Sequence, residues 1–82
     1  MLIQYDERKN QINIRKHHIS IPELATIFNN PSTILDIPDE PNSKYEPRYH
    51  AFGWTNTGWH VMIWYTYRGE NVIRIIGGRK LK

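Results

Sequence analysis

The side chains in this sequence that could do chemistry are arginine, lysine, histidine and tyrosine, in a chain that also carries three tryptophans. This set suits RNA cleavage without a metal ion. In that reaction the ribose 2′-hydroxyl attacks its own phosphate, so the enzyme needs a proton acceptor, a proton donor and cations beside the developing charge. Histidine, arginine and aromatic rings can supply these roles and splay the bases. The alternative is an aromatic core with solvated arginines, and composition alone favours it.

Other site chemistries find little support. The chain has no cysteine, which excludes a disulfide framework, a thiolate zinc site and a cysteine nucleophile. His17 and His18 are adjacent, so on a helix they point about 100° apart and cannot bind one metal ion from one face. The acids Asp36, Asp39 and Glu40 lie at a proline-rich loop, which is a poor support for a carboxylate pair. We therefore expect no metal site and no cofactor.

Phosphate binding has only an indirect signal. The sequence contains no Walker loop and no GxGxxG motif. Gly77-Gly78 precedes Arg79-Lys80, but two glycines at a strand end are more typical of a bend than of a phosphate cradle. The net charge is +3, with an acidic segment at residues 21–47 and a basic one at residues 48–82. This pattern suits a phosphate-bearing ligand or an acidic protein partner, and ordinary solvated surface charge explains it equally well.

The N-terminal half predicts a short strand and two helices that would position these residues. The strand runs from Leu2 to Tyr5. Asp6 is a good N-cap for the first helix, which we expect to end near His17. The capping box Ser20-Ile21-Pro22-Glu23 predicts the start of the second helix, and Asn29-Asn30-Pro31 predicts its end.

The C-terminal half predicts strands. A short strand at Thr33–Ile37 and a proline-rich loop are followed by three strands rich in aromatic and β-branched residues. The three are Arg48–Thr55, Trp59–Tyr67 and Val72–Ile76. Short glycine-containing turns join them, so we expect an antiparallel meander and an α+β fold.

Length and hydropathy set the remaining limits. The 82 residues predict a single domain spanning 1–82, with a core so small that a partner chain would stabilise it. The sheet also has more large apolar side chains than two thin helices can cover. No apolar run approaches ~18 residues and the N-terminus lacks a signal-peptide core, which predicts a cytoplasmic protein.

Several runs of the sequence resemble the BrnT toxin family, and together they span nearly the whole chain. The matching runs are Tyr5-Asp6-Glu7-Arg8-Lys9, Asn13-Ile14-Arg15-Lys16-His17, Ile19-Ser20, Ala25-Thr26-Ile27-Phe28, Glu46-x-Arg48, Gly53 and Arg74-Ile75-Ile76-x-x-Arg79-Lys80. The resemblance implies a type II toxin–antitoxin toxin with a RelE-like fold. Such a toxin is a metal-independent endoribonuclease that inhibits translation and growth. It also implies a cognate ribbon-helix-helix antitoxin, which forms a complex with the toxin and contacts the operator DNA.

The resemblance also points to site residues, most of which are basic. The arginines are expected on the scissile phosphate, and His17 or Lys16 is expected to handle a proton. Tyr65 is included only because it lies on a central strand. The candidates are catalytic His17, Lys16, Arg48, Arg74, Arg79 and Tyr65, with Arg15 and Lys80 as RNA-binding residues.

The sequence departs from the family pattern at three places. His18 stands where the family has glycine, so we expect the first helix to lack the easy left-handed glycine stop. Gly77-Gly78 replaces Ser-Ala, which is expected to loosen the strand end that carries Arg79. Family members often continue into a further helix, and the sequence given ends at Lys82, so weak or lost nuclease activity is one expectation.

Two alternatives to an active ribonuclease stay open at this stage. The first is a catalytically inactive family member that binds the antitoxin and regulates its own operon. The second is a small basic RNA-binding protein with no role as a toxin.

Overall fold

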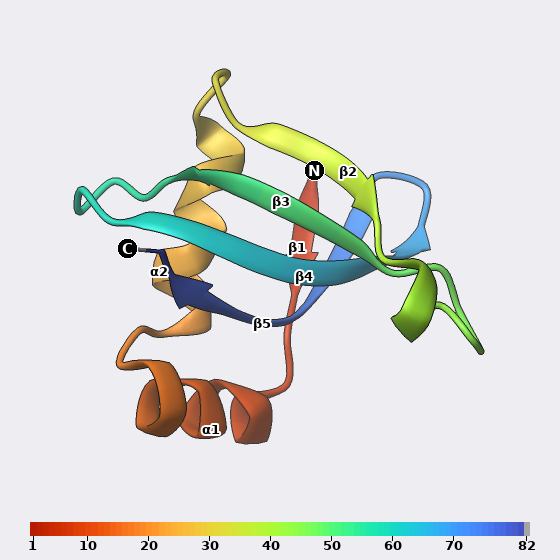
Figure 1. Cartoon of the computed structure of the whole chain (residues 1–82), viewed down its shortest axis with the longest axis horizontal. Helices are drawn as coiled ribbons and strands as arrows, with labels where there is room; N and C mark the ends of the chain where they lie inside the picture. The colour runs from red at the N-terminus through yellow and green to blue at the C-terminus, as the bar shows by residue number, and fades with distance from the viewer. Residues whose placement is uncertain (82) are drawn as a thin grey trace.

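A mixed five-stranded sheet and two helices form the molecule, as shown by a computed structural model that describes residues 1–81 (Figure 1). The molecule also contains two short 3-10 helices, one after α2 and one between β2 and β3. In chain order the elements are β1 (Leu2–Gln4), α1 (Glu7–His17), α2 (Ile21–Ala25), η1 (Thr26–Asn29), β2 (Ile34–Pro38), η2 (Glu40–Asn42), β3 (Tyr49–Trp54), β4 (His60–Gly69) and β5 (Val72–Lys80). No helix among residues 1–81 has the length and apolarity needed to cross a membrane.

The strand order is β1-β5-β4-β3-β2. Strands β2 to β5 pair antiparallel, so the predicted meander and the α+β class are confirmed. Strand β1 pairs with β5 in parallel, with Ile3 opposite Ile73, which makes the sheet mixed. Parallel neighbours need a long connection, and here nearly the whole chain separates β1 from β5.

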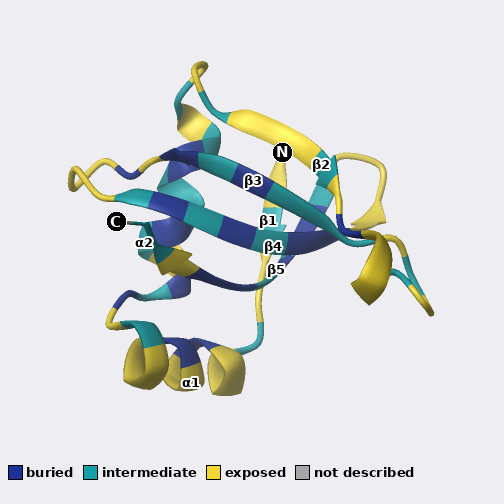
Figure 2. Cartoon of the chain, viewed as in Figure 1, coloured by how far each residue is buried: buried dark blue, intermediate teal, exposed yellow. Residues whose placement is uncertain are grey.

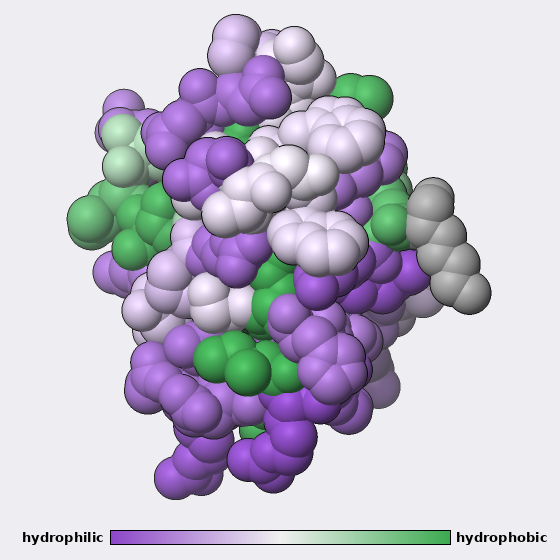
Figure 3. Space-filling model, turned by 90° about the vertical axis from the view of Figure 1, so that its left-hand side faces the viewer, coloured by the Kyte–Doolittle hydropathy of each residue, from purple (hydrophilic) through white to green (hydrophobic). Residues whose placement is uncertain are grey.

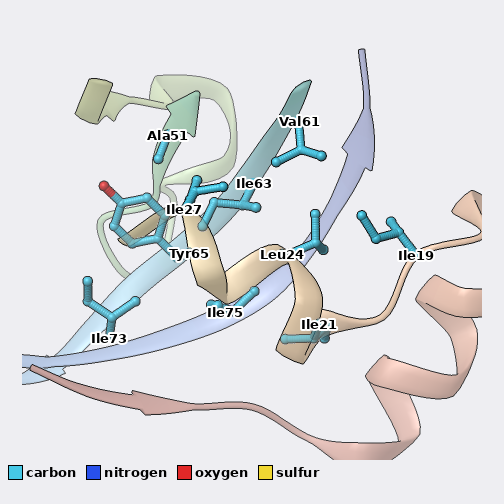
Figure 4. Close-up of a cluster of buried hydrophobic side chains, with 10 residues drawn as sticks. All are labelled: Ile19, Ile21, Leu24, Ile27, Ala51, Val61, Ile63, Tyr65, Ile73 and Ile75. Atoms are coloured by element: carbon cyan, nitrogen blue, oxygen red, sulfur yellow. The ribbon is translucent and has the colours of Figure 1, made fainter. Parts of the chain in front are cut away.

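The hydrophobic core lies between α2–η1 and one face of the sheet (Figures 1 and 4). Ile21, Leu24 and Ile27 are spaced by three residues, so they share one face of this helical segment and point at the strands. The remaining buried apolar residues are Ile19, Ala51, Val61, Ile63, Tyr65, Ile73 and Ile75. They explain why β3, β4 and β5 alternate in burial, whereas the edge strand β2 stays largely exposed (Figure 2).

Strand β5 is longer than predicted. It continues through Gly77 and Gly78 to Lys80, so the predicted end at Ile76 is wrong. The pairing with β4 shifts just before the glycines, because Tyr65 pairs with Ile75 and Trp64 with Gly77, so an irregularity does lie beside them. A Cβ atom at Gly77 would lie 2.9 Å from a carbon of the Trp64 indole, and one at Gly78 would lie 2.8 Å from a backbone oxygen. The glycines therefore allow close packing within the strand and do not loosen its end.

Helix α1 is anchored through two asparagines, of which Asn13 reaches the sheet and Asn10 accepts from the N–H of Ile21 at 2.7 Å. Its buried residues are Asn10 and Asn13, whereas Ile12 and Ile14 are 43% and 38% exposed. The Asn13 side chain donates to the carbonyl of Ile19 at 2.9 Å and accepts from the backbone N–H of Gly78 at 3.0 Å. These bonds connect α1 to the segment before α2 and to β5. Polar anchoring thus replaces the apolar stripe that the sequence of this helix lacks.

The helix ends agree with the predicted caps, with one change. Asp6 accepts from the N–H of Arg8, and Ser20 accepts from the N–H of Glu23. Helix α1 ends at a left-handed residue, because His18 adopts φ 59° and ψ 32° and its N–H donates to the carbonyl of Ile14. A histidine therefore takes the conformation for which glycine is better suited.

Asn13→Ala should lower the free energy of unfolding by about 2 to 4 kcal/mol. The change leaves a buried carbonyl and a buried N–H without partners, at about 1 to 3 kcal/mol each. Urea unfolding measures the loss, with Gln11→Ala as the control because Gln11 is exposed and bonds only to Glu7 on the same helix. Equal stability of the two variants would show that the asparagine does not hold α1.

His18→Gly should stabilise the protein by about 0.5 to 1 kcal/mol, because it removes left-handed strain that is only partly offset by glycine's greater freedom in the unfolded chain. Lys16→Gly, two residues earlier in the last turn of α1, is the matched control and should destabilise by up to about 1 kcal/mol. Thermal and urea unfolding of both variants test the sign. A destabilising His18→Gly would contradict the strain argument.

Candidate active site

The sheet face opposite α2 carries basic, aromatic and polar side chains. Alternation along the strands and the pairing register place them in rows across β3, β4 and β5. Trp64 occupies the centre of this face and pairs with His50 on β3 and Gly77 on β5. Successive rows are Arg48–Thr66–Arg74, His50–Trp64–Gly77, Phe52–Met62–Arg79 and Trp54–His60, with Arg48 placed by alternation because it immediately precedes β3. We call this surface the open face.

His17 reaches the open face from the end of α1. It lies four residues after Asn13, so both side chains project from the same side of the helix. Asn13 fixes that side against β5, and the His17 ring meets the Trp64 indole edge-on, with ring centroids 6.1 Å apart at 87°. A helix residue and a strand residue distant in sequence are thereby brought together.

The surroundings of His17 favour its neutral form. Burial lowers the pKa of its ring below the ordinary value of 6.5. Positive charge on Lys16, Arg79 and His18 lowers the same pKa further. A neutral imidazole can accept a proton at neutral pH, which is the property of a general base.

The three candidate arginines are divided between two places on the open face. Arg48 and Arg74 flank Thr66, whereas Arg79 pairs with Met62, four residues away along β4 or about 13 Å. Trp64 lies between the two places. The expectation that all three share one phosphate is therefore not supported by the register. Arg79 is the arginine whose charge acts on His17.

The arginines of the open face have no carboxylate partner among residues 1–81. Within those residues, the arginine that forms an ion pair is Arg68, whose Nη1 lies 3.2 Å from Oε2 of Glu46. The Nε of Arg48 is buried and has no hydrogen-bond partner there. An unpaired buried guanidinium donor is costly, and this atom is itself inaccessible to an anion at the surface. With no carboxylate partner in the described part of the chain, the arginine charge of this face is available for phosphate.

Tyr65 lies on the opposite face, within the core, and its position argues against the predicted catalytic role. Its hydroxyl donates to the Asp36 carboxylate at 2.6 Å and accepts from the Asp36 N–H at 2.7 Å. Burial, followed by this hydrogen bond to the carboxylate, raises the pKa of Tyr65 well above its ordinary value. The group is therefore a structural link between β4 and the edge strand β2.

Lys80 is also separated from the open face. It pairs with Val61, and its Nζ lies 3.9 Å above the centroid of the Trp59 ring. Consecutive strand residues point to opposite faces, so Lys80 is directed away from the face that carries Arg79. Arg15 and Lys16 are exposed near the end of α1, close in sequence to His17.

Two residues of this arrangement were not among the predicted site residues. The first is Trp64, which alternation along β4 places on the face opposite its neighbour Tyr65. The second is Asn13, which belongs to one of the runs that resemble the family, but whose anchoring role depends on its tertiary partner Gly78. Among residues 1–81, no group of three histidines and acids is placed to hold a metal ion.

Comparison with known proteins identifies the family. A family model described as the ribonuclease toxin BrnT of type II toxin–antitoxin systems matches residues 5–82. The chain is also similar to the crystal structure of the Brucella abortus ribonuclease toxin BrnT, with a TM-score of 0.77 and 23% identity over 100% of this chain and 97% of that chain. That structure shares the fold. No curated protein matches. The chain belongs to the BrnT family of type II toxin–antitoxin ribonuclease toxins.

Proposed function

We propose that this chain is a metal-independent endoribonuclease whose active site is the open face. Membership of a ribonuclease toxin family supports the activity at the level of reaction class. The observation that carries the finer proposal is the grouping of His17, Trp64 and Arg79 from three separate elements. It supplies a neutral base, a cation and an aromatic surface at one place.

In the proposed reaction His17 accepts the proton of a ribose 2′-hydroxyl. The 2′-oxygen attacks the adjacent phosphorus, and the bond from phosphorus to the 5′-oxygen breaks. Arg79 stabilises the charge that develops on the phosphoryl oxygens. Lys16, an ammonium beside the base, donates a proton to the leaving 5′-oxygen. The products are a 2′,3′-cyclic phosphate and a 5′-hydroxyl end, and no metal ion is required because cationic side chains balance the charge.

The second pair of arginines extends the proposed RNA-binding surface. Arg48 and Arg74 lie beyond Trp64, at a distance from Arg79 that suits another phosphate of the same strand. Neither arginine has a carboxylate partner among residues 1–81, which supports this assignment. An RNA strand would therefore cross the sheet, with the scissile phosphate at Arg79.

The family implies an antitoxin partner. We propose that this partner is a ribbon-helix-helix protein that inhibits the toxin and through which the complex contacts operator DNA. Half-exposed aromatic and basic groups on the open face offer it a surface to cover. The alternative is a chain that binds such an antitoxin but does not cleave RNA. The cleavage experiments below distinguish this chain from an active ribonuclease.

His17→Ala and Arg79→Ala should each reduce RNA cleavage by about 100-fold or more, because they remove the base and the phosphate ligand. Cleavage of a labelled RNA in the presence of a chelator measures this loss. Arg68→Ala is the control, since it removes an exposed arginine that is already paired with Glu46. Unchanged cleavage by both site variants would reject the assignment.

The pKa of His17 gives a separate prediction. Cleavage should rise with pH through a midpoint below 6.5 and then level off, because His17 acts only when neutral. An NMR titration of the ring reports the same midpoint without RNA. Lys16→Gln should move it upward, because a charge that lowers the pKa is lost, and Arg15→Gln is the charge-matched control. A midpoint above 6.5 would contradict the environment described for this ring.

A further inference from the structure

A groove of about 280 Å³ with a mixed apolar and polar lining lies at the end of β3. Its lining comes from η1, the loop after it and the start of the β3–β4 turn. The lining residues are Thr26, Asn29, Asn30, Pro31, Trp54, Thr55 and Asn56. Figure 3 faces this end of the molecule and shows mainly hydrophilic and intermediate side chains around small separate hydrophobic spots. Such a surface suits a polar ligand with a flat apolar face.

Trp54 is the aromatic wall of this groove. It is 55% exposed, and its indole stacks on the His60 ring with centroids 4.7 Å apart and only 15° between the planes. The two residues are direct cross-strand partners on β3 and β4. His60 therefore backs one side of the indole and holds it in a fixed orientation, while Trp54 also borders the groove. A fixed, exposed aromatic ring is a stacking platform for a base.

Side-chain amides supply hydrogen-bonding groups around the platform. Asn29 and Asn56 are exposed, and their side chains make no hydrogen bond within residues 1–81. Each amide offers two donors and a carbonyl acceptor, which can bind the edge of a heterocyclic base. Pro31 adds an apolar surface to the same groove. The combination of a ring, an apolar wall and free amides is the chemistry that recognises a nucleobase.

The groove lies on the β3 side of the sheet, away from Arg79 on β5. The Trp54–His60 row is a step of two residues, or about 7 Å, along β4 from the row of Met62 and Arg79, and Trp54 lies two strands, or about 10 Å, across the sheet from Arg79. A neighbouring nucleotide of the same RNA strand can span this separation. We propose that this groove is a base-recognition subsite, in which a nucleobase of single-stranded RNA stacks on Trp54 and is read by the amides of Asn29 and Asn56. The inference rests on the proposed function, since it assumes that RNA binds the open face.

The test uses a single-stranded RNA oligonucleotide whose 2′-hydroxyls are all methylated. It cannot be cleaved by 2′-hydroxyl attack, so binding is measured apart from catalysis. Trp54→Ala should weaken binding by about 5- to 100-fold, as expected for the loss of one stacked base. Trp54→Phe should restore most of the affinity because a ring is kept. Trp59→Ala is the matched control, since Trp59 is an exposed tryptophan held by Lys80 on the other face.

Two further variants keep the test independent of Trp54 alone. His60→Ala should weaken binding less than Trp54→Ala, because the platform remains but loses its support. Asn29→Ala combined with Asn56→Ala should change which nucleotide is preferred beside the cleavage site in a pool of random RNA. Circular dichroism confirms that each variant is folded before its affinity is compared.

The failures of the two proposals are distinguishable. If the wild-type chain cleaves RNA, but Trp54→Ala keeps its affinity and its cleavage preference, the subsite is overturned and the ribonuclease proposal stands. Binding of the methylated RNA that depends on Trp54, together with unchanged binding by His17→Ala, supports the subsite even if cleavage depends on other residues. A wild-type chain that neither binds nor cleaves RNA overturns both.

Discussion

The bridge made by the Asn13 side chain is the interaction on which the rest of the site depends. A single amide joins the carbonyl of Ile19 to the N–H of Gly78, so it holds α1, the start of α2 and the last strand in one arrangement. Because α1 contributes no residue to the hydrophobic core, this bridge and the bond from the Ile21 N–H to Asn10 hold the helix in place. His17 follows one turn later and is placed against Trp64. Gly77 in β5 completes the arrangement by leaving room for the indole and the asparagine.

Because side chains alternate along each strand, the two faces of the sheet carry different kinds of residues. Tyr65 and Trp64 are neighbours on β4, yet the first is buried against the helices and bonded to Asp36, and the second belongs to the open face. The core face carries the aliphatic side chains that stabilise a small domain. The open face is left with arginines that lack acidic partners and with aromatic rings. A face of this kind is compatible with the ribonuclease class of the family.

Local signals in the sequence were enough for much of the fold. The caps at Asp6 and Ser20 and the alternating strands predicted the helices and the meander, because these features depend on neighbouring residues. The parallel pairing of β1 with β5 and the passage of β5 through its glycines depend on contacts between distant segments, so local patterns could not predict them. The same distinction applies to the candidate site. The sequence named Arg79 and His17 as candidates one by one, whereas the separation of Arg79 from Arg48 and Arg74 depends on the pairing register of the strands.

The central claim is that the open face cleaves RNA by attack of the neighbouring 2′-hydroxyl, with cationic side chains in place of a metal ion. Analysis of the product ends tests it most directly. The purified chain is incubated with RNA in the presence of a chelator, and the newly formed ends are identified by mass spectrometry. The account predicts 2′,3′-cyclic phosphate and 5′-hydroxyl ends, and no cut where the scissile nucleotide carries a 2′-deoxy sugar. Ends with a 3′-hydroxyl, or cleavage that the chelator abolishes, would contradict it.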